Sequence, residues 1–245
     1  MKNILQKLGL VVFVILSVYN SNAQTAEAYL QAASAKHKIG DYADALQDVN
    51  AAILLSPTYD AYLLRASIFY LTSNYSDAIR NASSALSLNE NGYEAYLIKG
   101  KSWYAIGDYE SAMKDIEKTL AINSEQAEAL YYEGLCKKNE GNYESAIDFY
   151  NRAIALNSND AGMYNARAIC FYFNGNTEKA FEDFDKAISI QPAFAEAYFN
   201  RAKFYYYEGE IEKACTDWLK AIALQYVDAE AYVKKNCAEQ EISDK

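Results

Sequence analysis

Histidine is nearly absent from this chain, since His37 is the single histidine among 245 residues. Acid–base catalysts and zinc sites most often use histidine, and zinc sites combine it with closely spaced cysteines. The cysteines at 136, 170, 215 and 237 contain no such close pair, and the 10 glycines form no phosphate-binding loop. We therefore expect His37 to be a solvated helix residue, and we expect no catalytic residue, no metal and no cofactor.

Positive charge is also in short supply. The chain has 33 acidic against 23 basic residues, a formal net charge of -10. Such a charge repels phosphate backbones, so nucleic acid is a poor partner. With 51% hydrophobic residues and 2 prolines, the composition is typical of packed helices and excludes a disordered chain.

The sequence begins with a short apolar segment. Lys2 and Lys7 precede an apolar run from Leu8 to Val18, and small residues end at Ala23. This pattern predicts a secretory signal peptide over residues 1–23, cleaved after Ala23. The alternative is a membrane anchor, but an 11-residue run is well short of the roughly 20 residues that cross a bilayer. We expect an exported chain, periplasmic or extracellular, without membrane insertion, and without a lipid because no cysteine follows the cleavage position.

A repeat dominates the rest of the chain. The positions Tyr42, Tyr75, Tyr109, Tyr143, Thr177 and Ile211 are spaced by 33, 34, 34, 34 and 34 residues. Alanine follows three places later every time, at Ala45, Ala78, Ala112, Ala146, Ala180 and Ala214. A fixed period in this range indicates a stacked repeat architecture.

Each unit reads as two helices of about 14 residues with a turn between them. The turns fall at Gly40, Ser73, Gly107, Gly141, Gly175 and Gly209, where glycine tolerates a positive backbone angle. Small residues such as Ala33, Gly100 and Gly134 let the paired helices approach closely. We expect the layer behind them to be filled by Leu55, Leu88, Ile122, Leu156, Ile190 and Leu224.

These residues resemble the tetratricopeptide repeat family, most clearly in the segment AEAYFNRAKFYYYEGEIEKACTDWLKAIALQ at residues 195 to 225. The resemblance covers Ala26 to Gln225. It implies an all-α fold, a right-handed superhelical solenoid of helix-turn-helix repeats with a concave groove. We divide residues 24–227 into six repeats at about 26–58, 59–92, 93–126, 127–160, 161–194 and 195–227. Residues 228–239 are expected to form a capping helix, and residues 240–245 a polar tail.

The resemblance also implies that the groove is lined by the first helix of each repeat. Some family members clamp a peptide carboxylate there with basic and polar residues, but this chain has Leu30, Ser34 and Leu64 at the corresponding early positions. In the middle and late repeats, aromatic side chains surround two lysines and an asparagine. The predicted partner-binding residues are Lys101, Tyr104, Tyr131, Lys138, Asn165, Tyr172, Phe173 and Tyr206. Packing of these tyrosines between neighbouring helices is the alternative.

Charged residues recur in a second pattern. Lys99 with Asp115, Arg167 with Asp183, and Arg201 with Asp217 occupy matching places in the two helices of one repeat. In the repeat where Glu133 replaces the base, Phe149 replaces the acid. This joint change favours structural ion pairs over a ligand site.

The cysteines differ in what they are expected to do. Cys136 and Cys170 hold the same place in consecutive repeats, where helix packing keeps equivalent positions too far apart for a disulfide. Cys215 and Cys237 lie 11 and 10 residues from the turn near Tyr226 and Val227, and so at similar heights on antiparallel helices. In an exported chain they are candidates for a disulfide, with two separate thiols as the alternative.

The sequence thus predicts a non-enzymatic interaction module that binds a protein or peptide in an aromatic groove. The alternative is a structural scaffold that packs permanently into a cell-envelope assembly or a homo-oligomer. The sequence does not identify the partner or the oligomeric state.

Overall fold

The computed structural model describes residues 23–237, and all regular secondary structure in that range is helical. The all-α prediction is therefore confirmed. Among the described residues, no helix combines the length and apolar character that crossing a bilayer requires. The predicted signal peptide (residues 1–23), apart from Ala23, and the predicted tail (residues 240–245) lie outside the described residues.

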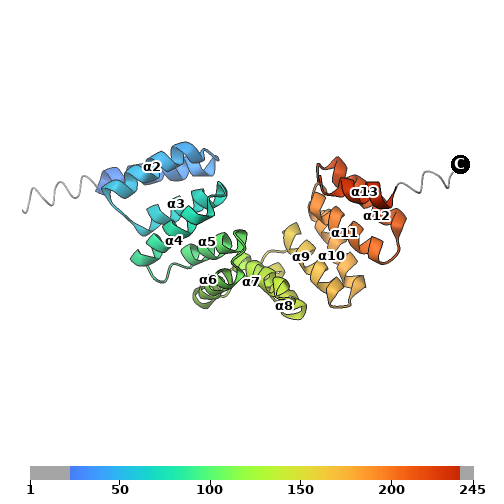
Figure 1. Ribbon diagram of the computed structural model, residues 1–245. Helices are drawn as coiled ribbons and strands as arrows, with labels where there is room; N and C mark the ends of the chain where they lie inside the picture. Colours follow the sequence, from blue (N-terminus) through green and yellow to red (C-terminus); the bar gives the residue numbers. More distant parts are fainter. Residues whose placement is uncertain (1–22, 238–245) are drawn as a thin grey trace, which may run out of the picture. The chain divides into compact units, whose positions relative to one another are not determined.

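The described residues form two compact units, one ending at Ser124 and the other beginning at Glu125. Figure 1 labels most of their helices. The first unit contains a helix over residues 23–38, then α2 (Tyr42–Leu55), α3 (Tyr59–Leu71), α4 (Tyr75–Leu88), α5 (Tyr93–Ala105) and α6 (Tyr109–Ile122). The second contains α7 (Ala127–Asn139), α8 (Tyr143–Leu156), α9 (Ala161–Phe173), α10 (Thr177–Ile190), α11 (Ala195–Tyr207), α12 (Ile211–Ala223) and α13 (Ala229–Asn236). Within each unit, successive helices from α2 onward pack against one another.

The turn inside each repeat follows from two adjacent residues. The first, Gly40 or its equivalent glycine, adopts a positive φ between 77° and 85°, which costs glycine little. The second caps the next helix: the carboxylate of Asp41 accepts a hydrogen bond from the Asp44 amide, and Asp108 does the same for Ser111. The predicted positive angle is present at every such glycine and also at Ser73, where φ is 59°.

The core lies between the two helices of each repeat. Small residues of the first helix face one fully buried side chain of the second helix. These buried side chains are Val49, Ala82, Ile116, Tyr150, Phe184 and Trp218. Where the buried side chain is Ile116 or Tyr150, the opposite residue is Gly100 or Gly134, and a Cβ there would lie 2.8 or 2.5 Å from it. The two glycines are therefore required by close packing.

The predicted filling of this layer is wrong at three positions. Leu88, Ile122 and Leu156 are 52%, 41% and 46% exposed. Each ends its helix six residues after the buried position, which at about 3.6 residues per turn rotates the side chain roughly 240° away from it. The other three predicted positions, Leu55, Ile190 and Leu224, have the same offset and are half-buried.

The predicted ion pairs are confirmed. Lys99 lies 3.2 Å from Asp115, and the guanidinium groups of Arg167 and Arg201 each lie 2.7 Å from Asp183 and Asp217. Each arginine also donates to the second helix of the preceding repeat, Arg167 to Asn151 at 2.7 Å and Arg201 to Asp185. These side chains therefore connect neighbouring repeats as well as the helices of one repeat.

Candidate partner-binding surface

In the first unit, the first-helix surface carries an apolar hollow with an acidic edge. Residues Asp60, Leu63, Leu64 and Ser67 of α3 follow the spacing that places side chains on one helix face. With Glu94 and Ile98 of α5, they surround a cavity of about 260 Å³. The acids lie at the start of each helix, where they also favour the helix dipole.

Glu94 is held in position by a tyrosine of the neighbouring repeat. The Tyr59 hydroxyl donates to the Glu94 carboxylate at 3.2 Å. Burial, together with the negative charge of Glu94, raises the pKa of Tyr59 to about 12. The hydroxyl therefore stays protonated and keeps donating at neutral pH.

Two predicted residues of this unit lie among aromatic rings. The Lys101 ammonium lies 4.4 Å from the centre of the Tyr70 ring, a cation–π contact between α5 and α3. The Tyr104 ring lies 5.2 Å from that of Tyr109. Both predicted side chains are half-buried. His37 is half-buried too, with its Nε2 3.3 Å from the Ser67 hydroxyl, and is less solvated than we expected.

In the second unit, the two adjacent predicted residues Tyr172 and Phe173 differ in role. Tyr172 packs against Phe204 of α11, with ring centres 4.1 Å apart, and its hydroxyl donates to Glu208 at 2.8 Å. Burial and the bond to Glu208 raise the pKa of Tyr172 to about 12. Phe173 stacks on Tyr143 yet remains 54% exposed. Tyr172 thus joins neighbouring repeats, while Phe173 presents a free face.

Other predicted residues of this unit are less accessible than the sequence suggested. Asn165 is 4% exposed, and its amide accepts from Asn200 at 3.2 Å. Tyr131 is half-buried, with its ring 5.9 Å from that of Tyr150. Lys138, at the end of α7, is also half-buried.

Tyr206 lines a cavity of about 230 Å³ at the C-terminal end of the described chain. This cavity also contacts Lys203 and Tyr207 of α11, Trp218 of α12, and Tyr232 and Lys235 of α13. The sequence pattern identified Tyr206 but missed the contributions of α12 and α13. The spacing of Tyr232 and Lys235, three residues apart on one helix face, was a usable signal.

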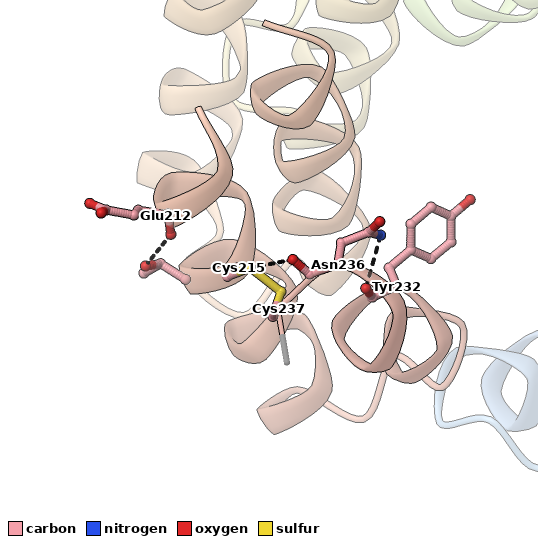
Figure 2. Close-up of a disulfide and its surroundings, with 6 residues drawn as sticks. Glu212, Cys215, Tyr232, Asn236 and Cys237 are labelled. Atoms are coloured by element: carbon pink, nitrogen blue, oxygen red, sulfur yellow. Dashed lines mark hydrogen bonds between the residues drawn. A yellow bond between two sulfur atoms is a disulfide. The ribbon is translucent and has the colours of Figure 1, made fainter. Parts of the chain in front are cut away.

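The helix that completes this cavity is tied to the last repeat. The structure contains the Cys215–Cys237 disulfide that the spacing predicts, with Cα atoms 5.8 Å apart (Figure 2). The Asn236 side chain donates to the Tyr232 carbonyl at 3.0 Å, within α13. Tyr232 and Val233 pack against the buried Trp218 cluster, as expected of a capping helix. Cys136 and Cys170 are buried free thiols.

No group of three or more metal-binding side chains occurs within residues 23–237. The described surface presents aromatic rings, carboxylates, lysines and hydroxyls.

Comparison with known proteins gives consistent matches over most of the chain. Models of the tetratricopeptide repeat match residues 30–82, 72–127, 127–160 and 161–194. The comparison with curated proteins gives no match.

Several solved structures share the fold. MamA is 28% identical, with 67% of this chain and 96% of that chain covered at a TM-score of 0.56. A repeat protein from Parabacteroides merdae ATCC 43184 is 22% identical, with 85% and 83% covered at 0.66. YrrB, described as a TPR protein with an unusual peptide-binding site, is 24% identical, with 76% and 97% covered at 0.58.

Proposed function

Because the chain belongs to the tetratricopeptide repeat family, we propose that it holds a segment of another protein and does not catalyse a reaction. Repeats of this family generally mediate protein–protein interactions. The segment would bind on the first helices of the repeats. In the first unit, α3 and α5 line one cavity, and in the second unit, α11 lines another together with α12 and α13.

The observation that carries this proposal is the exposure of aromatic side chains on these helices. Phe173, Tyr206 and Tyr207 are 54%, 37% and 58% exposed. Large rings lose little rotamer entropy on binding, and they often dominate the affinity of protein interfaces. Their clustering on first helices of the second unit supports a binding surface at that place.

The test is recovery of the partner by crosslinking and pull-down from the native source, followed by affinity measurement with variants. Phe173→Ala should weaken binding by about 1–2 kcal/mol, as for an interface hot spot, and should lower the melting temperature less than Tyr172→Ala does, because Phe173 is 54% exposed. The matched control is Leu219→Ala, because Leu219 is also 54% exposed but lies on a second helix. Equal affinities for the two variants would contradict a first-helix binding surface.

Tyr172→Ala serves a different purpose. Since Tyr172 packs against Phe204 in the interior of the second unit, this variant should lose stability. It separates the packing role of a first-helix aromatic residue from the binding role assigned to Phe173.

The oligomeric state distinguishes the proposed function from the scaffold alternative. If the chain binds a partner segment, size-exclusion chromatography with light scattering should show a monomer that captures the partner reversibly. A stable homo-oligomer that buries Phe173 and Tyr206 would favour the scaffold.

A further inference from the structure

The C-terminal cavity is formed by three helices that present different chemical groups. Lys203 and Tyr206 come from one face of α11, and Tyr232 and Lys235 from one face of α13. Trp218 of α12, which is 0% exposed, forms part of the wall. The cavity therefore combines an aromatic lining with two ammonium groups from separate helices.

The two lysines add positive charge to a chain whose formal net charge is -10. The Lys203 ammonium lies 5.7 Å from the centre of the Phe199 ring. Neither Lys203 nor Lys235 forms an ion pair with an acid within residues 23–237, whereas Lys213 nearby pairs with Glu210. Two unneutralised cations at one cavity attract an anionic group.

Trp218 adds a second, independent feature. Its indole Nε1 is buried and has no hydrogen-bond acceptor among the described residues. A buried donor without an acceptor is unfavourable, by about 1–3 kcal/mol. Trp218 is one of the residues that line the cavity.

The size of the cavity limits what can enter. Its volume of about 230 Å³ is below the roughly 300–1,000 Å³ of pockets that enclose whole small molecules. A site of this size suits one or two side chains of an extended chain.

We propose that this cavity binds an acidic side chain next to an aromatic or aliphatic one in the partner segment. The carboxylate pairs with Lys203 and Lys235, and the apolar side chain lies against Tyr206, Tyr232 and Trp218. This inference rests on the proposed function, because it names the chemistry of the segment that is held.

Tryptophan fluorescence provides the readout. The chain has 2 tryptophans, Trp103 and Trp218, so Trp103→Phe leaves only the indole of the cavity. The probe is the peptide acetyl-Gly-Phe-Glu-Gly-amide, and its matched control has glutamine in place of glutamate. Titration of the oxidised protein with the acidic peptide should change the Trp218 emission, and the neutral peptide should bind about tenfold more weakly.

Lysine variants in the same background test the charge. Lys203→Gln and Lys235→Gln should each weaken the acidic peptide about tenfold and abolish its advantage over the neutral one. The control is Lys234→Gln, which removes the same charge from the adjacent, exposed position of α13 outside the cavity. Equal loss in all three variants, or equal affinity for both peptides, would overturn the proposal.

Two further outcomes separate the inference from its premise. In the first outcome, the native partner is still captured, and its capture is weakened by Phe173→Ala but not by Lys203→Gln or Lys235→Gln. The proposed function then stands and the cavity assignment fails.

The second outcome concerns the chain's own segment 238–245, which carries Glu239, Glu241 and Asp244. If replacing these three by amides raises peptide affinity tenfold or more, the cavity belongs to that segment and the partner assignment is overturned.

Discussion

The two buried cysteines, Cys136 and Cys170, show how burial controls the reactivity of a thiol. Burial raises the pKa of each to about 12, and Glu133 adds to the effect at Cys136. Because the thiolate is the reactive form, both residues should be inert in the folded protein.

We predict that iodoacetamide at pH 8 modifies neither thiol in the native protein and modifies both in denaturant, as measured by mass spectrometry. The pKa values of the two thiols in the folded state lie above the unfolded value of about 8.5. At a pH between the unfolded and folded values, the folded state therefore binds more protons than the unfolded state. The free energy of unfolding should therefore fall as the pH rises from about 9 towards 12. Rapid labelling of either cysteine in native protein would contradict the burial argument.

Arg201 connects three helices through its guanidinium group. It donates to both oxygens of Asp217, at 2.7 and 2.8 Å, and also to Asp185. Burial alone would lower the pKa of Arg201, but these carboxylates outweigh it and raise the pKa. Arg201 is therefore charged throughout the stable pH range.

Asp217→Asn should lower the free energy of unfolding by about 2–3 kcal/mol, because it removes one charge of a largely buried pair. Chemical denaturation followed by circular dichroism measures the change. The control is Glu110→Gln, which breaks the exposed pair with Lys114 and should have no measurable effect. Equal effects of the two variants would mean that the Arg201 bridge adds no more than a surface pair.

The turn between α3 and α4 departs from its counterparts because Ser73 holds a positive φ of 59° where they have glycine. A non-glycine residue in this region carries a strain of about 1 kcal/mol. Gly107, at the corresponding turn of the next repeat, has a φ of 85° and nothing within 4 Å of an added Cβ. Exchanging serine and glycine between these two turns should therefore change the backbone strain alone.

We predict that Ser73→Gly stabilises the protein by about 0.5–1 kcal/mol and that Gly107→Ser destabilises it by a similar amount. Thermal denaturation of the single and double variants measures both effects, and the double variant should resemble the parent. A loss of stability in Ser73→Gly would show that the serine contributes an interaction that offsets its strain.

The capping helix α13 has 8 residues, too few to be stable as an isolated helix. Its packing against Trp218 and the Cys215–Cys237 bond hold it in place. The bond closes a loop with a sequence separation of 22 residues. Such a constraint stabilises the folded state relative to the unfolded state by about 3 kcal/mol.

Reduction with dithiothreitol, or the Cys215→Ala and Cys237→Ala double variant, should therefore increase amide hydrogen exchange across residues 229–236. The α9 and α10 helices serve as internal references, and their protection should be unchanged. If α13 remains protected after reduction, packing alone holds the cap. If both native cysteines are alkylated without reduction, the disulfide is not formed in the protein.

At the scale of the whole chain, the fold was predictable because its determinants are local and repeated. Glycine followed by aspartate or asparagine sets a turn and a cap, and each alanine at the helix contact fixes a close approach. These signals recur in phase, so an error at one repeat is corrected by the others. The prediction that Leu88, Ile122 and Leu156 are buried was wrong. An apolar residue that recurs at one repeat position indicates the same environment in each repeat, but it does not show whether that environment is buried or exposed.

The candidate site was less predictable, since it depends on which neighbours a side chain meets. Tyr172 and Phe173 are adjacent in sequence, yet only the structure shows that Phe204 covers the first. The cavity at Tyr206 depends on Lys235 and Tyr232, which belong to the non-repeating cap. A repeat pattern predicts only the residues that recur in each repeat, so it does not identify residues of the capping helix as part of a site.

We propose that the chain is exported, and this proposal also explains how a disulfide can form. The mature protein should begin at Gln24, because Ala23 ends the cleavage pattern, and should carry no lipid, because no cysteine follows that position. N-terminal sequencing and intact mass of protein from the native source test this. Retention of Leu8 to Val18 in the isolated protein would contradict cleavage and favour a membrane anchor.

The capping helix also sets where the stack of repeats ends. An uncapped terminal repeat exposes the kind of apolar face that its internal neighbours bury against one another. The first repeat of a second molecule could then dock on that face, and such a head-to-tail contact does not close on itself but extends into a fibre. By covering Trp218 and its neighbours, α13 removes that apolar face from the end of the last repeat.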